Sequence, residues 1–334
     1  MSASVSQPWL ITGASGMLGF TVLPHLKALG YAMCSPTREQ LNLALSPTAI
    51  QTQLTELSQA VDGFAGVLHL AAMTDVDGAE VDSELAYAVN TYGTAALADF
   101  ARLNGLPLVA ISTDYVFDGT KNAPYLPTDD PNPINHYGRS KWLGEQAVMR
   151  HAEAQLPWAI LRVSWLYGLG RHNFVSWVME QVALRQTPAG KDLPPLSIVD
   201  DWTGSPTWTG SVALGLGWLL PKLQGDTNKA FDASGIYHAS DHGTVSKYDQ
   251  ACWIAQHLGV PADTIAQIIQ PVSATTLTFD AQRPAHCPLT DPRYPQRDWQ
   301  QAFGGYVQTL LNPTLDLRQI FLPVVRATPF TAAV

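Results

Sequence analysis

The chain has 334 residues, 46% of them hydrophobic and 14% charged, which supplies ample material for a core and excludes a disordered chain. A formal net charge of −9 argues against a nucleic-acid-binding surface, which needs clustered basic residues. The three cysteines are scattered without metal-ligand spacing, so we expect neither a disulfide framework nor a metal site. Residues 1–7 lack the basic and apolar runs of a secretory signal, and no apolar stretch is long enough for a membrane span; we expect a cytoplasmic protein.

The first pattern along the chain predicts a strand, a glycine turn and a helix. The apolar run Trp9–Thr12 is followed by a turn with three glycines, and apolar residues then recur at helical spacing. Glycines let the backbone approach a pyrophosphate closely, and the N-terminus of the following helix binds it. The turn therefore predicts a dinucleotide-binding site at Gly13, Gly16, Met17, Leu18 and Gly19.

The next apolar run, residues 31–35, predicts a second strand. A site for NAD usually has an acidic residue near the end of this strand, but here the first acid is Glu39, after Arg38. Arg38 is suited to bind a 2′-phosphate, although an ordinary loop arginine is an equal alternative. The pattern favours NADPH as cofactor and leaves NADH possible.

Two further buried strands are predicted at residues 66–72 and 108–111. The first ends in Ala71 and Ala72, which are small enough to pack closely against a cofactor, and it contains His69, which we expect to be a core residue. The second ends in Ser112 and Thr113. Ligands of open α/β sheets bind beyond the carboxyl ends of the strands, so these hydroxyls could polarise a substrate carbonyl, or simply close the strand in a turn.

Residues 120–136 are rich in proline and aspartate and predict an ordered loop over the site. After this loop, Tyr137 and Lys141 are four residues apart, which places them on one face of a helix. A cation beside a phenol would lower the tyrosine pKa from about 10, so that the phenol could exchange a proton with a substrate oxygen. A surface tyrosine and a solvated lysine are the alternative.

Taken together, these motifs resemble the dTDP-4-dehydrorhamnose reductase family, in the extended branch of the short-chain dehydrogenases/reductases. The resemblance is carried by residues 112–119, by the segment Tyr137-Gly138-Arg139-Ser140-Lys141, and by shorter matches around residues 76–80, 89–90, 144–145, 162–168, 201–207 and 283–284. It implies an α/β fold: a Rossmann-type doubly wound parallel sheet with a smaller α/β substrate-binding lobe. We expect residues 1–168 and about 201–230 in the first, and about 169–200 and 231–334 in the second.

The resemblance also implies roles for individual residues. Thr113, Tyr137 and Lys141 would be catalytic, with Tyr137 as the proton donor and Lys141 also holding the nicotinamide ribose. Trp165 would lie beside the sugar, although an ordinary core tryptophan is nearly as compatible with its position. We assign Ala71, Ala72 and Asn90 to the cofactor side, and to the substrate side Thr74, Val76, Ser112, Asp114 and Trp165.

Some residues depart from the family pattern. Leu126 and Trp202 take the places of a usual acidic residue and a usual glutamine, which leaves the exact nucleotide sugar open. The expected activity is reduction of a nucleotide-linked 4-keto-6-deoxy sugar by a monomer or homodimer without nucleic-acid or membrane partners. The alternatives are an epimerase or dehydratase on the same scaffold and a non-catalytic regulatory subunit resembling the methionine adenosyltransferase β subunit.

The C-terminal part is expected to build the substrate lobe. It contains a short apolar run at residues 236–239, which predicts a strand, and amphipathic stretches at residues 248–258 and 310–320, which predict helices.

Overall fold

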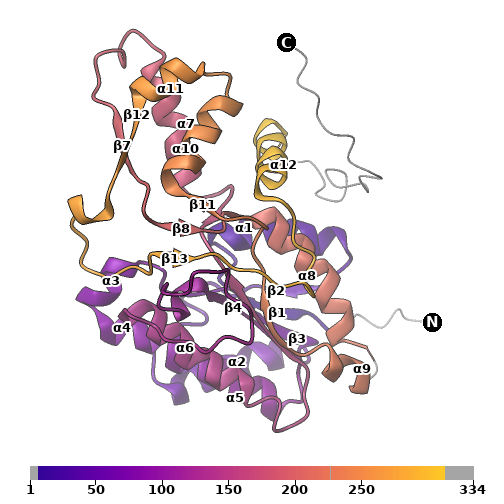
Figure 1. The fold of residues 1–334 in the computed structure, drawn as a ribbon. Coiled ribbons are helices and arrows are strands. Elements are labelled where there is room, and N and C mark those ends of the chain that lie inside the picture. The colour runs from indigo at the N-terminus through magenta and orange to yellow at the C-terminus, as the bar shows by residue number, and fades with distance from the viewer. Residues whose placement is uncertain (1–6, 226, 313–334) are drawn as a thin grey trace.

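A computed structural model describes residues 7–225 and 227–312. Its centre is a six-stranded parallel sheet in the order β10-β5-β4-β3-β1-β2 (Figure 1). The strands of this sheet are β1 (Trp9–Thr12), β2 (Met33–Cys34), β3 (Gly66–His69), β4 (Leu108–Thr113), β5 (Trp158–Val163) and β10 (Gly235–His238).

Helices cover both faces of the sheet because successive strand residues point to opposite sides. Leu10 belongs to one core cluster, whereas its neighbours Trp9 and Ile11 belong to the other. The Leu10 face is covered by α2 (Pro47–Ala60), α5 (Thr94–Leu103) and α6 (His136–Met149). The opposite face is covered by α1 (Met17–Ala28) and α8 (Thr209–Leu223), which pack against each other.

Short elements connect the strands near the carboxyl edge of the sheet. After β3 come α3 (Val76–Val81), α4 (Ser83–Tyr87) and the π-helical turn η1 (Ala88–Gly93), and after β4 comes the 3₁₀ turn η2 (Asp114–Val116). The remaining connectors are β6 (Leu166–Tyr167), paired with β9 (Thr207–Trp208), and α9 (Thr227–Asp232).

A smaller lobe lies above this edge in Figure 1. It contains α7 (Phe174–Arg185), α10 (Lys247–His257) and α11 (Ala262–Ile268), a parallel pair of β7 (Leu196–Val199) and β12 (Ile269–Val272), and the turn η3 (Ala274–Thr276). Between the main sheet and the smaller lobe runs a small sheet in the order β11 (Val245–Ser246), β8 (Thr203–Gly204) and β13 (His286–Cys287).

The expected place of residues 236–239 is wrong. The strand forms, but β10 pairs in parallel with β5 in the main sheet, with Ile236 opposite Ile160, and does not belong to the smaller lobe. Sequence spacing could not reveal this, because α8 and α9 return the chain to the free edge of the sheet before the strand begins. The other boundaries of the two lobes stay a prediction.

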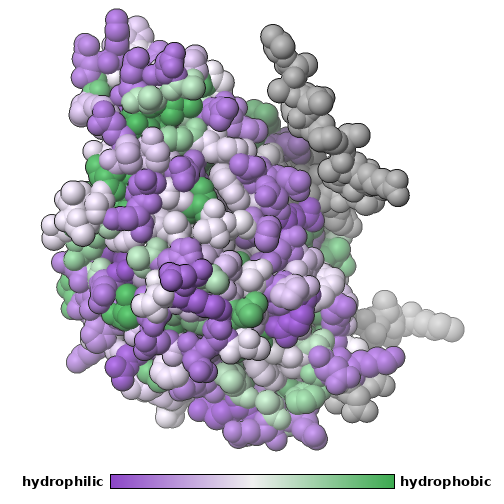
Figure 2. All heavy atoms as spheres, in the orientation of Figure 1, coloured by the Kyte–Doolittle hydropathy of each residue, from purple (hydrophilic) through white to green (hydrophobic). Residues whose placement is uncertain are grey.

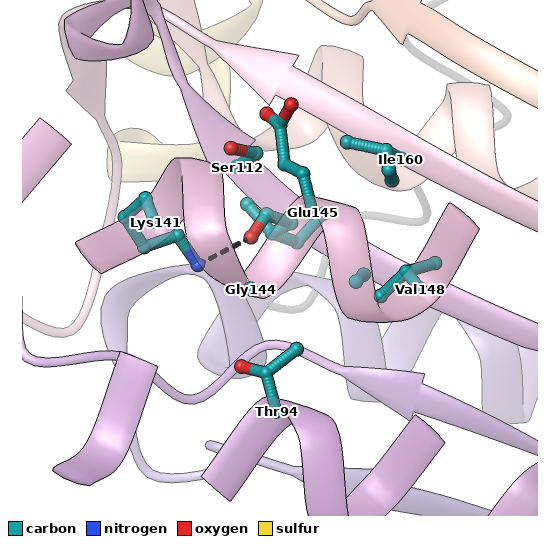
Figure 3. A pocket seen from close by; sticks show the side chains of 9 residues that line it. Thr94, Ser112, Lys141, Gly144, Glu145, Val148 and Ile160 are labelled. Carbon is teal, nitrogen blue, oxygen red and sulfur yellow. Dashed lines mark hydrogen bonds between the residues drawn. The ribbon is translucent and has the colours of Figure 1, made fainter. Parts of the chain in front are cut away.

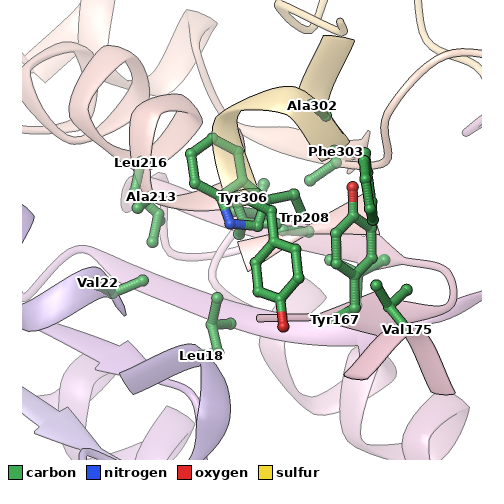
Figure 4. Close-up of a cluster of buried hydrophobic side chains, with 14 of the residues drawn as sticks. Leu18, Val22, Tyr167, Val175, Trp208, Ala213, Leu216, Ala302, Phe303 and Tyr306 are labelled. Atoms are coloured by element: carbon green, nitrogen blue, oxygen red, sulfur yellow. The ribbon is translucent and has the colours of Figure 1, made fainter. Parts of the chain in front are cut away.

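The two lobes share one core. The cluster on the α1 face continues into α7, α10 and α12 (Trp299–Leu311), and Figure 4 shows the rings of Tyr167 and Tyr306 meeting beside Leu18. Those two rings are edge to face, with centroids 5.4 Å apart. The lobes are therefore joined by buried apolar contacts as well as by the chain.

Other expectations can be compared directly with the elements. The helix expected over residues 248–258 is confirmed as α10, whereas β2 is shorter than expected. Most of the stretch 310–320 lies outside the described residues, so that prediction stays open. No helix among the described residues has the length and apolarity needed to span a bilayer. Hydrophilic residues are interspersed with small hydrophobic patches on the face shown in Figure 2.

Candidate active site

The glycine turn between β1 and α1 is tightly packed. Gly13 has φ +74°, and a Cβ there would lie 2.5 Å from the backbone nitrogen of Ala71. A Cβ on Gly19 would lie 2.4 Å from the carbonyl oxygen of Ala14. Both positions therefore require glycine.

The N-terminus of α1 has no side-chain cap. Gly16 is the N-cap residue, and Met17 begins the helix. The first backbone N–H groups of a helix have no partner within it, so they suit a pyrophosphate. Leu18 points into the core, which leaves only its backbone for a ligand. This geometry fits the dinucleotide site expected from the sequence.

His69 fixes the neighbouring strand end. Its ring nitrogens lie 2.7 Å from Thr12 Oγ1 and 2.9 Å from Thr94 Oγ1, and Thr12 Oγ1 in turn accepts a hydrogen bond from the Ala71 backbone. Burial, with a smaller contribution from Lys141, lowers the pKa of His69 to about 3, so the ring is neutral. The expectation of a core histidine is confirmed.

The other residues assigned to the cofactor differ in how deeply they are buried. Ala71 and Ala72 follow β3 and are half-buried beside the glycine turn, and Arg38 is exposed beyond β2. Asn90 is buried: its Oδ1 accepts from Met73 N at 2.9 Å, and its Nδ2 donates to Met73 O and Ser140 Oγ, each at 3.0 Å. The side chain of Asn90 thus joins the segment after β3 to α6.

Tyr137 and Lys141 lie in the first half of α6, as expected. Asn135 caps this helix by accepting a hydrogen bond from Gly138 N at 2.7 Å. A Cβ on Gly138 would lie 2.1 Å from Tyr115 O, and one on Gly144 would lie 2.4 Å from Asn90 O. The two glycines therefore let α6 pack directly against the backbone of η2 and η1.

The expected effect of Lys141 on Tyr137 is wrong. Lys141 Nζ donates to Ile111 O at 2.7 Å, and burial lowers the pKa of Lys141 to about 8. Burial raises the pKa of Tyr137 to about 12, and a hydrogen bond with Thr113 opposes that rise only in part. Desolvation of the phenolate outweighs any nearby positive charge, so Tyr137 carries its proton at neutral pH.

Thr113 belongs to a buried chain of hydrogen bonds. Its hydroxyl donates to Asp114 Oδ1 at 3.0 Å, and Ser164 Oγ donates to Asp114 Oδ2 at 2.7 Å. Burial raises the pKa of Asp114 to about 6, although both hydroxyls act against the rise. Asp114 is 2% exposed and orients Thr113, and its assignment to the substrate side stays a prediction.

Ser112 lies on the other side of β4. It is buried, and Figure 3 shows it beside Lys141, Glu145 and Thr94 at a cavity of about 10 Å³. Its Oγ has no hydrogen-bond partner among the described residues. Because successive strand residues alternate between faces, Ser112 and Thr113 cannot share a direction. The assignment of Ser112 to substrate binding stays a prediction.

A clamp on the substrate side was not anticipated. Arg283 donates to both carboxylate oxygens of Asp77, at 3.0 and 2.6 Å, and so ties the chain before β13 to α3. Val76, the first residue of α3, packs against the small core cluster of Ala79, Ala86 and Tyr137, and Thr74 is exposed two residues before it. Val76 thus lies beside the expected proton donor.

The loop at residues 120–136 is ordered, as expected. Tyr125 exchanges backbone hydrogen bonds with Pro288 O and Thr290 N, and its ring stacks on Phe117 with centroids 4.1 Å apart. These contacts hold the loop against the chain that follows β13.

Trp165 has an unusual backbone and an unexpected neighbour. Its φ of +44° is rare for a bulky residue, and a Cβ on Gly204 would lie 2.5 Å from the indole. Lys247 Nζ lies 3.5 Å from the centroid of the indole and 4.5 Å from that of Phe174. The contact of Lys247 with Trp165 could not be predicted from the sequence, because no local motif links two residues so far apart in the chain.

The described residues contain no group of three or more His, Cys, Asp or Glu side chains arranged for a metal ion. The chemistry available at this edge is therefore that of a protonated phenol, a threonine hydroxyl and two lysines beside an uncapped helix N-terminus. Together with the parallel sheet, this defines a Rossmann-type enzyme site of the short-chain dehydrogenase/reductase kind.

Comparison with known proteins places the chain more closely. Residues 8–311 match the family model described as RmlD substrate binding domain, and the chain belongs to that family. It is 32% identical to a dTDP-4-dehydrorhamnose reductase of Burkholderia thailandensis, over 91% of this chain and 99% of the relative. It is 34% identical to a dTDP-4-keto-6-deoxy-D-glucose reductase of Streptomyces niveus, over 88% and 96%.

Solved structures agree. A dTDP-4-dehydrorhamnose reductase from Yersinia enterocolitica superposes with a TM-score of 0.77 at 29% identity, covering 91% of this chain and 99% of that one. The enzyme of the same name from Bacillus anthracis, solved in complex with NADP, has a TM-score of 0.75 at 28% identity and the same coverage.

Proposed function

We propose that the protein is an NADPH-dependent reductase of a nucleotide-linked 4-keto-6-deoxy sugar, with dTDP-4-dehydrorhamnose as the first substrate to test. The relatives that bear this activity in their names cover nearly the whole chain. The observation that carries the proposal is that α6 brings Tyr137 and Lys141 against the carboxyl end of β4, where Thr113 lies: Lys141 Nζ donates to Ile111 O, and the ring of Tyr137 meets that of Tyr115.

The cofactor would be held by the uncapped N-terminus of α1, through Gly13, Gly16, Met17 and Gly19, with Arg38 available to a 2′-phosphate. NADPH supplies a hydride to a carbonyl carbon. The exposed Arg38 and the absence of an acid at the end of β2 support NADPH over NADH.

Within the chain, Tyr137 donates the proton to the substrate oxygen, because its raised pKa keeps the phenol protonated. Thr113 donates a hydrogen bond to the same oxygen once it turns from Asp114, and Asp114 with Ser164 sets the rotamer from which it turns. Lys141, whose ammonium is close to the sheet backbone, binds the ribose hydroxyls.

The test is the absorbance of NADPH during incubation with dTDP-4-dehydrorhamnose and a panel of 4-keto sugar nucleotides, repeated with NADH. A reductase consumes NADPH in proportion to substrate. An epimerase or dehydratase recycles its cofactor, so product formation without net NADPH consumption would contradict the proposal. So would the absence of any reaction, which is the behaviour expected of a regulatory subunit.

A further inference from the structure

Lys247, the first residue of α10 in the smaller lobe, is a cation without an acidic partner among the described residues. Within the described part of the chain it forms no ion pair, and its ammonium lies over the rings of Trp165 and Phe174. The side chain is half-buried, so its ammonium keeps only part of the hydration that it would have in water. Desolvation lowers the pKa of Lys247 to about 7, and the carboxylate of Asp114 offsets this only in part.

A folded protein seldom keeps an ammonium in this state without a reason, because desolvating it costs free energy that aromatic rings repay only partly. By comparison, Arg283 and Arg162 each donate two hydrogen bonds to one carboxylate, that of Asp77 and that of Glu145 respectively. Lys247 has no such ion pair with a described residue, and a bound anion would supply that partner.

The location restricts which anion this is. Trp165 directly follows Ser164, which holds Asp114 beside the catalytic Thr113. Phe174 begins α7, and Asn173 before it reaches Met17 at the start of α1, with Nδ2 3.8 Å from Sδ. Through Trp165 and Phe174, Lys247 therefore contacts both the segment that follows β5 and the start of α7.

A nucleotide sugar carries its two negative charges on the diphosphate, next to the sugar. The cofactor has a pyrophosphate too, but the uncapped N-terminus of α1 already provides N–H groups for it. Asp114, at the reacting end, is the charged group whose field reaches Lys247. These relations favour the substrate's diphosphate over the cofactor's.

We propose that Lys247 is a substrate-binding residue whose ammonium, steadied on the indole of Trp165, pairs with the diphosphate of the nucleotide sugar. The proposal rests on the proposed function, because it assumes a nucleotide-linked substrate. It gives Trp165 a second role: its ring positions the cation as well as bordering the sugar.

The experiment measures dTDP binding to the full chain by isothermal titration calorimetry, with dTDP as a non-reacting probe that carries the diphosphate. Lys247→Met removes the charge and keeps most of the side-chain volume. Its expected effect is a loss of dTDP affinity of about 10- to 100-fold, as for one charge-assisted hydrogen bond. Lys247→Arg keeps the charge and should lose less than the methionine variant.

The matched control is Lys222→Met. Lys222 also lies over a tryptophan, with Nζ 4.7 Å from the centroid of Trp218, but it is on α8 and lines a different pocket, with Tyr237 and Arg293. Its replacement should leave dTDP affinity within about twofold of wild type. NADPH binding, followed by quenching of tryptophan fluorescence, should be unchanged in Lys247→Met; a loss of NADPH affinity with dTDP affinity intact would assign the cation to the cofactor and overturn the proposal.

Turnover of the wild type separates this inference from the proposed function. If the wild type reduces a keto sugar nucleotide and Lys247→Met binds dTDP as tightly as the wild type, the role of Lys247 is wrong and the proposed function holds. If the wild type neither turns over the panel nor binds dTDP, both are wrong. Should Lys247→Met be recovered poorly, Lys247→Gln gives the same comparison, with circular dichroism to show that it is folded.

Discussion

Two regions of the proposed site, the end of β4 with α6 (the floor) and the start of α10 with Trp165 (the roof), differ in how their polar groups are paired. On the floor, at the end of β4 and along α6, Thr113 binds Asp114, Lys141 binds Ile111 O, and Asn90 binds Met73 and Ser140. On the roof, Lys247 rests on aromatic rings without an acid. A paired group has its geometry set by folding, whereas an unpaired cation gains its partner only on binding. In the proposals above, the floor carries out the chemistry and the roof binds the substrate.

The sharpest test of the floor is Tyr137→Phe. Without the phenol, kcat should fall by ~10²–10⁴-fold, the usual contribution of a positioned general acid. NADPH affinity should stay within about twofold, because the ring and α6 are retained. Stopped-flow absorbance of NADPH measures the first and fluorescence titration the second. Turnover at the wild-type rate would show that another group supplies the proton.

A buried ion pair between β5 and α6 should contribute strongly to the stability of the floor. Arg162 on β5 donates to both oxygens of Glu145 on α6, at 3.0 and 2.7 Å, and both side chains are almost fully buried. Glu145→Gln leaves the guanidinium without its counter-charge, so the free energy of unfolding should fall by about 3–5 kcal/mol. Urea denaturation measures it.

The control for that change is Glu180→Gln, which removes the carboxylate from the exposed pair with His172. Exposed pairs contribute little, so this variant should be within about 1 kcal/mol of wild type. If both variants lost the same free energy of unfolding, burial of the Arg162–Glu145 pair would not add to its contribution to stability.

The neutral His69 makes the floor sensitive to acid. The folded protein protonates His69 only near pH 3, whereas the unfolded chain does so near 6.5. The unfolded state therefore binds more protons between these values, and the stability that is present above pH 6.5 is lost as pH falls. By pH 5 the loss should be about 2 kcal/mol.

Other buried histidines also destabilise the folded protein as pH falls. The contribution of His69 is therefore measured as the difference in free energy of unfolding between wild type and a His69 variant. The free energy of unfolding is determined for wild type and His69→Gln at pH 7.5 and at pH 5. The advantage of the wild type should shrink by about 2 kcal/mol at the lower pH. An advantage that does not change with pH would show that His69 is not the responsible group.

The smallest expected effect concerns the clamp between floor and roof. Asp77→Asn keeps the shape but removes the charge that holds Arg283, which should loosen the chain before β13. We expect KM for the sugar nucleotide to rise by roughly threefold to tenfold, as for loss of one partly exposed charge pair at about 1 kcal/mol, with kcat nearly unchanged. Steady-state kinetics separates the two; a fall in kcat alone would assign Asp77 to the chemistry. Asp99→Asn, at an exposed pair with Arg102, is the control.

Much of the floor could be predicted from local sequence. The strand–turn–helix at residues 9–28 follows from apolar periodicity and three glycines, and the Tyr137–Lys141 pair follows from helical spacing. The direction of the tyrosine's pKa could not be predicted in this way, because it depends on how completely α6 is buried against η2 and β4.

What the sequence by itself determined is the set of elements and the residue types at their ends, since these depend on neighbours within one or two turns. Only the tertiary structure decided that residues 235–238 join the main sheet and that Ser164 binds the carboxylate of Asp114. It also decided that Lys247 meets Trp165, 82 residues earlier in the chain by their numbers. Such relations depend on packing between distant segments, for which a periodic pattern carries no information.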